Sequence, residues 1–161
     1  MPGDLTYSID TSALLDWWVR FYPPKAFKGL VSRMEALISE GRLRASREVQ
    51  EEIEREKDGI RDWLKAQHDL CIDSDERIQA VVAQLMAAHH NHDKPDKGIN
   101  GADPFVIGVA AVQAHPWVVV SGEKPGSVEN PKIPWVCRQY RPVPIRHMSF
   151  LEMILEEGWE L

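Results

Sequence analysis

The chain has 161 residues, of which 43% are hydrophobic and 27% are charged, as is ordinary for a globular protein that buries a core without disulfides. Nineteen Lys and Arg residues against twenty-five Asp and Glu residues give a formal charge of −6. This charge argues against a protein that wraps nucleic acid non-specifically, because that mode depends on neutralising phosphates. It leaves a nuclease open, since the carboxylates of a metal site contribute heavily to such a total.

No segment approaches the roughly 20 apolar residues needed to span a bilayer, so no membrane contact is expected. The N-terminus, Met1-Pro2-Gly3-Asp4, lacks the basic region and apolar stretch of a secretory signal. Cys71 and Cys137 form no metal-binding spacing. These features predict a cytoplasmic protein with a single domain over residues 1–161.

Short apolar runs alternate with stretches of helical periodicity, which predicts strands separated by helices. Strands are expected over 5–9, 42–45, 117–120 and 133–137. Helices are expected from Asp10-Thr11-Ser12 onward, over 27–38 up to a stop at Gly41, from Ser46 to a break near Asp58-Gly59, around Trp63-Leu64, from Asp73-Ser74 through Met86, from Asp103-Pro104 through Val112, and from the capping box Ser149-x-x-Glu152 to Gly158. Loops are expected over 89–101 and 122–131.

The unbroken apolar run Trp117 to Val120 is typical of a strand that is buried on both faces. Together with the alternation of strands and helices, it predicts an α/β fold with a central parallel sheet flanked by helices on both faces. Ligands of such folds bind beyond the carboxyl ends of the strands. Asp10 and Glu123 follow predicted strands, and Asp103 begins a helix that should lie at the same edge. We therefore expect these three carboxylates to meet.

Glu52 is a fourth candidate, three residues after Val49 and one before Ile53, at the border of the helix face that turns to the core. Carboxylates brought together raise one another's pKa values and resist joint ionisation. Two Mg²⁺ or Mn²⁺ ions would cancel the charge of four carboxylates, and these ions prefer oxygen ligands. A two-metal site of this kind suits in-line displacement at phosphorus, so phosphodiester hydrolysis is the expected reaction.

Four segments, YSIDTSALL, SREVQEEI, GADPFVIGVA and VVVSGE, resemble the PIN-domain nucleases in their order and spacing, and the resemblance spans nearly the whole chain. It implies a PIN-like fold and metal-dependent cleavage of RNA. Its four acidic positions, which would be catalytic and hold the metal, fall on Asp10, Glu52, Asp103 and Glu123. Its small polar positions, which would support the cofactor, fall on Ser12 and Ser121.

Further features look like an uncharacterised bacterial and archaeal PIN-like subgroup close to VapC-type toxins. They are Lys132-Ile133-Pro134-x-x-Cys137, the stretch from Phe27 to Leu43, and the terminal capping box. This likeness implies RNA as substrate, often a cognate antitoxin, and a homodimer. The chain departs from the pattern at Glu123, where many PIN domains have aspartate or asparagine.

Each candidate also has a structural interpretation. Asp10 and Asp103 lie where an aspartate caps a helix, and Glu52 lies in a glutamate-rich helix whose charges normally face solvent. The segment His89-His90-x-His92 offers competing metal ligands, although adjacent histidines do not face one direction and match no structural zinc spacing. The aromatic segment 17–22 could stack on unpaired bases, or it could bury its helix against the core.

The sequence thus predicts a Mg²⁺- or Mn²⁺-dependent endoribonuclease acting on single-stranded or loop RNA, with the toxin of a toxin-antitoxin pair as its expected setting. The alternative from another class is a PIN-like module that binds RNA or a protein without catalysis. A hydrolase built on the histidine loop is a third interpretation.

Overall fold

A five-stranded parallel sheet forms the centre of the protein in the computed structural model, which describes residues 3–56, 59–94 and 97–161. Its strands are β1 (Tyr7–Ile9), β2 (Leu43–Ser46), β3 (Cys71–Ile72), β4 (Val118–Val120) and β5 (His147–Met148), in the order β3-β2-β1-β4-β5. All four pairings are parallel, and Tyr7 of the central strand lies between Leu43 and Val118. All the strands therefore end at one edge of the sheet.

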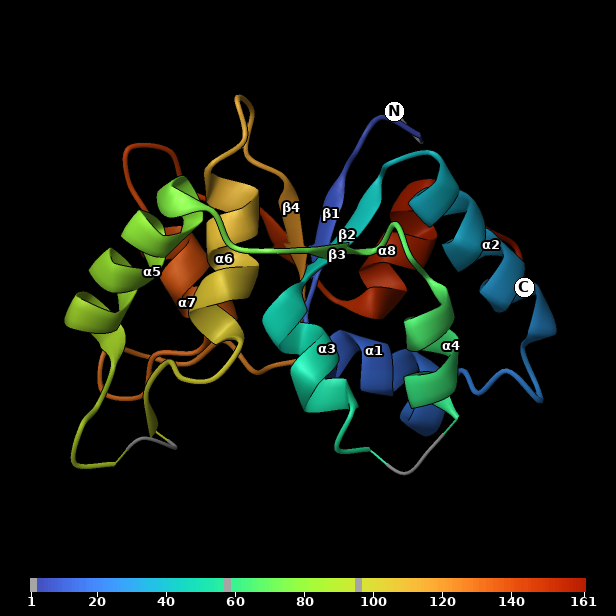
Figure 1. The fold of residues 1–161 in the computed structure, drawn as a ribbon, viewed down its shortest axis with the longest axis horizontal. Coiled ribbons are helices and arrows are strands. Elements are labelled where there is room, and N and C mark those ends of the chain that lie inside the picture. Colours follow the sequence, from blue (N-terminus) through green and yellow to red (C-terminus); the bar gives the residue numbers. More distant parts are fainter. Residues whose placement is uncertain (1–2, 57–58, 95–96) are drawn as a thin grey trace.

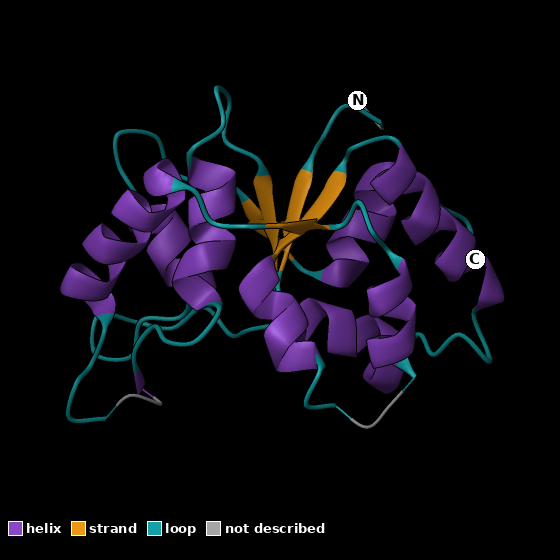
Figure 2. Ribbon diagram, viewed as in Figure 1, coloured by secondary structure: helices purple, strands orange, loops and turns teal. Residues whose placement is uncertain are grey.

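Helices cover both faces of this sheet (Figure 1), which is seen edge-on between two groups of helices in Figure 2. One face carries α5 (Glu76–His89), α6 (Asp103–Ala111) and α7 (Ile133–Gln139). The other carries α1 (Thr11–Leu15) with its π-helical continuation η1 (Asp16–Phe21), α2 (Lys28–Ser39), α4 (Ile60–Ala66) and α8 (Phe150–Glu157). Helix α3 (Arg47–Ile53) follows β2 at the carboxyl edge. The expected α/β fold is confirmed.

Several predicted helix ends are confirmed by their backbone geometry. Gly41 ends α2 with a φ of +77°, a left-handed conformation that favours glycine. The Ser46 hydroxyl accepts a hydrogen bond from the Val49 N–H and so caps α3. Ser149 and Glu152 form the expected capping box of α8, and Gly158 ends that helix at φ +70°. Along the described residues, no helix is long and apolar enough to cross a membrane.

The strand predicted over 133–137 is wrong, because these residues form the first turns of α7. Pro134 lies in the first turn of that helix, where the missing N–H costs nothing, whereas in a strand it would remove a ladder hydrogen bond. The buried residues of α7 include Ile133, Val136 and Cys137. Their spacing of three and four residues places them on one helical face, which turns to the core.

Other differences concern short elements and helix ends. The strands β3 and β5 have two residues each and were not predicted, since two residues carry no periodicity. Helix α3 ends at Ile53, earlier than the break predicted near Asp58-Gly59. Asp58 lies outside the described residues. The C-terminal end of α3 carries glutamates and no basic residue. Negative charges there interact unfavourably with the helix dipole, whose C-terminal end is itself negative. Helix α5 begins after Asp75, which caps it, rather than at Asp73-Ser74.

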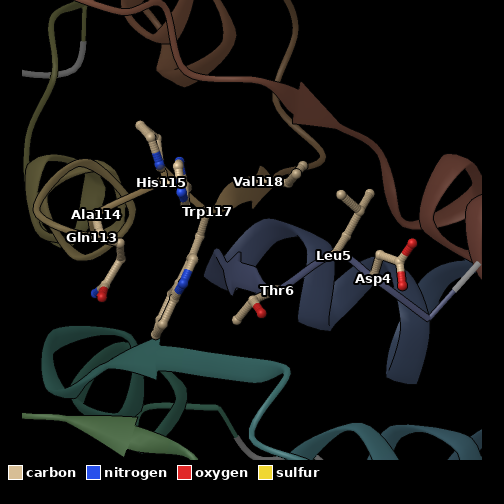
Figure 3. A pocket seen from close by; sticks show the side chains of 9 residues that line it. Asp4, Leu5, Thr6, Gln113, Ala114, His115, Trp117 and Val118 are labelled. Atoms are coloured by element: carbon tan, nitrogen blue, oxygen red, sulfur yellow. The ribbon is translucent and has the colours of Figure 1, made fainter. Parts of the chain in front are cut away.

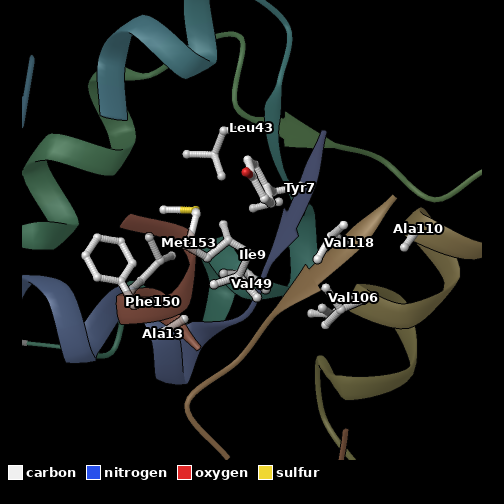
Figure 4. Packing of buried hydrophobic residues seen from close by; sticks show 14 of the residues in the cluster. Tyr7, Ile9, Ala13, Leu43, Val49, Val106, Ala110, Val118, Phe150 and Met153 are labelled. Atoms are coloured by element: carbon white, nitrogen blue, oxygen red, sulfur yellow. The ribbon is translucent and has the colours of Figure 1, made fainter. Parts of the chain in front are cut away.

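The core lies against both faces of β1. Tyr7 and Ile9 are fully buried with Phe150 and Met153 on the face that α8 covers (Figure 4). Ser8 points to the opposite face, where its hydroxyl donates to the Val106 carbonyl of α6 at 2.8 Å. That bond satisfies a fully buried hydroxyl in an apolar strand.

A buried ionic contact joins α8 to the sheet. The Glu157 carboxylate accepts hydrogen bonds from the Arg42 guanidinium and from the Tyr7 hydroxyl, each at 2.5 Å. The Glu157 side chain is only 4% exposed. Burial and the Glu157 charge together raise the pKa of Tyr7 well above its usual range, so this hydroxyl stays protonated and donates.

Replacing Glu157 by glutamine is expected to lower the free energy of unfolding by about 2 kcal/mol, because Arg42 loses its buried counter-charge. The loss stays below that of a fully enclosed pair, since Glu40 also contacts Arg42. Urea denaturation measures it. Glu156→Gln is the matched control, because Glu156 pairs with the half-exposed Arg146 and should change stability by less than about 0.5 kcal/mol. Equal losses in the two variants would contradict the assignment.

Candidate metal centre

Three carboxylates from distant parts of the chain meet at the carboxyl edge of the sheet. Asp10 follows β1, Asp103 is the first residue of α6, and Glu123 follows β4. One carboxylate oxygen from each lies within 4.8 Å of the others, and among the described residues these three form the group of ligand-type side chains that is compact enough to hold an ion. Asp10 is 2% exposed, and the other two are partly buried.

Two serine hydroxyls hold the Asp10 carboxylate in place. Ser12 donates to Oδ2 at 2.6 Å, and Ser121 donates to the same oxygen at 3.1 Å. Each hydroxyl in turn accepts a backbone N–H, Ser12 from Gly122 and Ser121 from Glu123. Both hydroxyl protons are therefore directed at Oδ2, and no hydrogen bond among the described residues occupies Oδ1, which is available to a cation.

Asp103 and Glu123 are each oriented by a backbone N–H. The Asn100 N–H donates to Asp103 Oδ2 at 3.2 Å, within the turn that precedes α6. The Ile133 N–H, at the start of α7, donates to Glu123 Oε2 at 3.0 Å. Helix α7, predicted as a strand, thus anchors the last acidic residue of the cluster.

Glu52 lies beside the three carboxylates rather than among them. Its Oε1 accepts the Thr11 hydroxyl at 2.6 Å, and its Oε2 lies 3.4 Å from the Ala102 N–H at the start of α6. Gly101, with a φ of +55°, makes this approach possible, because a Cβ there would lie 2.8 Å from Oε2. Glu52 therefore connects the first turns of α1 and α6, from which Asp10 and Asp103 project.

Burial and mutual repulsion make these carboxylates hard to ionise. Burial, and then the charge of Glu123, raises the pKa of Asp10 to about 7. Burial, followed by the charges of Glu123 and Asp10, raises the pKa of Asp103 to about 8. A bound divalent cation would reverse both shifts, since it favours the ionised form of every carboxylate around it. The cluster thus has the electrostatics of a cation site.

The interpretation of Asp10 and Asp103 as helix caps is wrong. Asp10 occupies the N-cap position of α1, but its side chain makes no capping hydrogen bond. Ala102 is the N-cap residue of α6, and the Asp103 carboxylate instead accepts an N–H from the preceding turn. Neither carboxylate is therefore explained by helix capping.

Residues that the sequence did not single out complete the surroundings. The Asp16 carboxylate lies against Gly122, where a Cβ would fall 2.1 Å from its Oδ2, and it is paired with Arg20 at 2.8 Å. Glycine at 122 thus lets the chain after β4 pass Asp16. Thr11, next to Asp10, and Gly101, two residues before Asp103, could be noticed in the sequence, but their contacts with Glu52 could not.

The histidine segment shows no comparable convergence. His90 Nδ1 donates to the Ile99 carbonyl at 2.9 Å, and its ring contacts that of His92. His89 packs instead against Trp135, with ring centroids 5.7 Å apart. Over the described ranges these side chains belong to no group of three ligand atoms.

The aromatic segment is divided between core and surface. Trp17 is fully buried, edge-on to Trp18 and Trp63 and stacked on Phe150. It is therefore closed to a base. Phe21 is 61% exposed.

A separate pocket of about 400 Å³ lies at the opposite end of β1 and β4 (Figure 3). Leu5 and Thr6 line it from the start of β1, and Trp117 and His115 line it from the approach to β4. Its lining includes one carboxylate, Asp4. The acidic cluster lies beyond the other ends of these strands, where open parallel sheets bind their ligands.

Fold and site together define an α/β protein with a parallel sheet and, at the carboxyl ends of β1 and β4, a cluster of carboxylates that is suited to a cation. The chain belongs to the family described as a domain of unknown function, DUF4411, whose model matches residues 7–161. No curated protein matches the sequence.

Proposed function

We propose that this protein is an endoribonuclease that hydrolyses RNA phosphodiester bonds with Mg²⁺ or Mn²⁺. The observation that carries the proposal is the convergence of Asp10, Asp103 and Glu123 within 4.8 Å. The resemblance of the four acidic segments to PIN-domain nucleases supports it and supplies RNA as the substrate.

The residues fit a hard divalent cation. Every ligand atom is a carboxylate oxygen, which Mg²⁺ and Mn²⁺ prefer, and no soft ligand takes part. The raised pKa values of Asp10 and Asp103 reflect burial and repulsion between carboxylates, and a bound cation would offset both. When bound, the ion would supply Lewis-acid stabilisation of the charge that develops on the phosphate oxygens.

The protein's own part is to fix the carboxylates before substrate arrives. Ser12 and Ser121 restrain Asp10 through one oxygen, and the Ile133 N–H restrains Glu123. Groups that hydrogen-bond to metal ligands in this way orient the ligands and limit which ions the site can bind. Glu52 has the same positioning role, since it bridges Thr11 and the backbone at Ala102.

A panel of single-stranded and hairpin RNAs, incubated with the purified protein and Mn²⁺, tests the proposal. Cleavage should require the metal and stop with a chelator. Cleavage that persists in the chelator contradicts the metal-dependent reaction. Failure to cut any RNA, combined with RNA binding, would favour the non-catalytic module instead.

Glu52→Gln is expected to lower the cleavage rate by about 10- to 100-fold, the range typical for residues that orient metal ligands. The Mn²⁺ affinity measured by calorimetry should fall with it. Glu51→Gln is the matched control, because Glu51 lies on the same helix with an exposed side chain. Equal activity in the two variants would show that Glu52 is only a surface charge.

The remaining expectations, a cognate antitoxin, a homodimer and a cytoplasmic location, depend on the sequence and the resemblance. The toxin role is tested by expressing the chain in a bacterial host, where growth arrest should require Asp10. Growth arrest that persists in Asp10→Asn would contradict a nuclease toxin.

A further inference from the structure

A pocket of about 390 Å³ opens directly beside the acidic cluster. It is formed by the segment between β4 and α7, and its lining includes Glu123 of the cluster itself. The other lining residues are Lys124, Gly126, Asn130 and Lys132. Positive side chains therefore stand next to the site at which a phosphodiester would react.

The backbone gives this pocket a defined shape. Gly126 and Pro131 pair as an antiparallel bridge, and the Ser127 N–H donates to the Asn130 carbonyl at 3.1 Å, which closes a tight turn. Gly126 has a φ of +78°, and a Cβ there would lie 2.7 Å from the Lys132 backbone nitrogen. Only glycine fits there, and the turn that it allows brings Lys124 and Lys132 into the lining of one pocket.

The charges of the pocket suit an anion. Within the described part of the chain, Lys124 makes no ion pair and is exposed, whereas Arg20 near the cluster is already paired with Asp16. Asn130 lines the same pocket, and its side-chain NH2 group can donate to a phosphate oxygen. A chain of net charge −6 needs such a local cationic surface to hold a polyanion beside its carboxylates.

We propose that this pocket binds a backbone phosphate of the RNA strand, one that adjoins the phosphodiester at the carboxylates, with Lys124 and Lys132 as its cationic contacts. The proposal rests on the proposed function, because it needs an RNA strand at the cluster. A phosphate held here fixes where the strand crosses Glu123, and so positions the scissile bond without reading the base sequence.

The test measures binding of a labelled single-stranded RNA to the Asp103→Asn protein, which should not cut it, over a series of KCl concentrations at constant Mg²⁺. Adding Lys124→Gln and Lys132→Gln together should reduce the magnitude of the slope of log affinity against log salt by about 0.7, the value for one phosphate contact on a single strand. The affinity at low salt should fall by at least about fivefold. Lys28→Gln is the matched control, since Lys28 is exposed on α2, a helix of the other face.

Equal slopes in the double variant and the Lys28→Gln control would overturn the proposal, and so would RNA that does not bind at all. Competition by inorganic phosphate with no change in the RNA slope would also overturn it, by showing a site for free phosphate. Cleavage by the wild-type chain is scored separately. A wild-type chain that binds RNA with the predicted slope change but never cuts it would contradict the nuclease and leave the phosphate contact established.

Discussion

Asp103→Asn is expected to lower the rate of Mn²⁺-dependent RNA cleavage by at least about 100-fold. Loss of a residue that only orients a ligand typically costs 10- to 100-fold, so loss of a ligand charge should cost at least the upper value. Asparagine keeps the shape of the side chain and can still accept the Asn100 N–H, so the turn before α6 is preserved. Only the charge that the cation needs is removed.

The same substitution should have the opposite effect on the stability of the metal-free protein. Without an ion, Asp103 is a buried carboxylate beside Glu123 and Asp10, and its neutral replacement relieves that repulsion. We therefore expect the Tm of Asp103→Asn to exceed that of the wild type in chelator, and to rise less when Mn²⁺ is added. Thermal scans with and without metal measure both effects.

The exposed Glu51 again provides the control, and Glu51→Gln should change neither cleavage nor the response of the Tm to Mn²⁺. Full cleavage activity in Asp103→Asn would remove the carboxylate cluster from the mechanism. A metal-free Tm below that of the wild type would instead show that the Asp103 charge stabilises the fold.

The metal-free protein is expected to lose stability as the pH rises from about 5 to about 8. The pKa values of Asp10 and Asp103 in the folded chain, about 7 and about 8, lie above the ordinary aspartate value of 3.8. Between these values the unfolded chain has released protons that the folded chain retains, so rising pH favours unfolding. Each unit of pKa difference corresponds to about 1.4 kcal/mol, and the combined effect should reach on the order of several kcal/mol.

Saturating Mn²⁺ should reverse this dependence, because the ion binds only deprotonated carboxylates and therefore stabilises the folded protein more strongly as the pH rises. Urea denaturation at several pH values measures how the free energy of unfolding depends on pH in chelator and in Mn²⁺. Asp10→Asn should flatten the metal-free profile, whereas Glu51→Gln should leave it unchanged. A metal-free protein that becomes more stable between pH 5 and 8 would contradict the shared burial of these carboxylates.

Much of the fold could be predicted because it depends on signals local to the chain. Ser46 and the pair Ser149 and Glu152 cap helices through hydrogen bonds to residues three positions away. Gly41 ends α2 because its own backbone is left-handed. The meeting of Asp10, Asp103 and Glu123 could be predicted for a geometrical reason, since parallel strands separated by helices all end at one edge.

Elements that depend on distant neighbours could not be predicted. The strands β3 and β5 are two residues long and exist because β2 and β4 offer free edges to them. Residues 133–137 have a composition that suits a strand, and Pro134 was the signal against it, but the helix is stabilised by burial against the sheet. A short apolar run carries too little information to decide between the two.

By itself the sequence determined the class of fold, the edge of the sheet at which the carboxylates gather, and the oxygen character of the ligands, because order along the chain and side-chain chemistry suffice for these. Tertiary structure alone decided that Glu52 lies beside Asp10, Asp103 and Glu123 rather than among them. It also placed Lys124 and Lys132 around one pocket beside them. The physical reason is that both outcomes depend on contacts made only in the folded chain. Glu52 is held by the Thr11 hydroxyl and the Ala102 N–H, and the lysines are placed by the turn at Gly126 between β4 and α7.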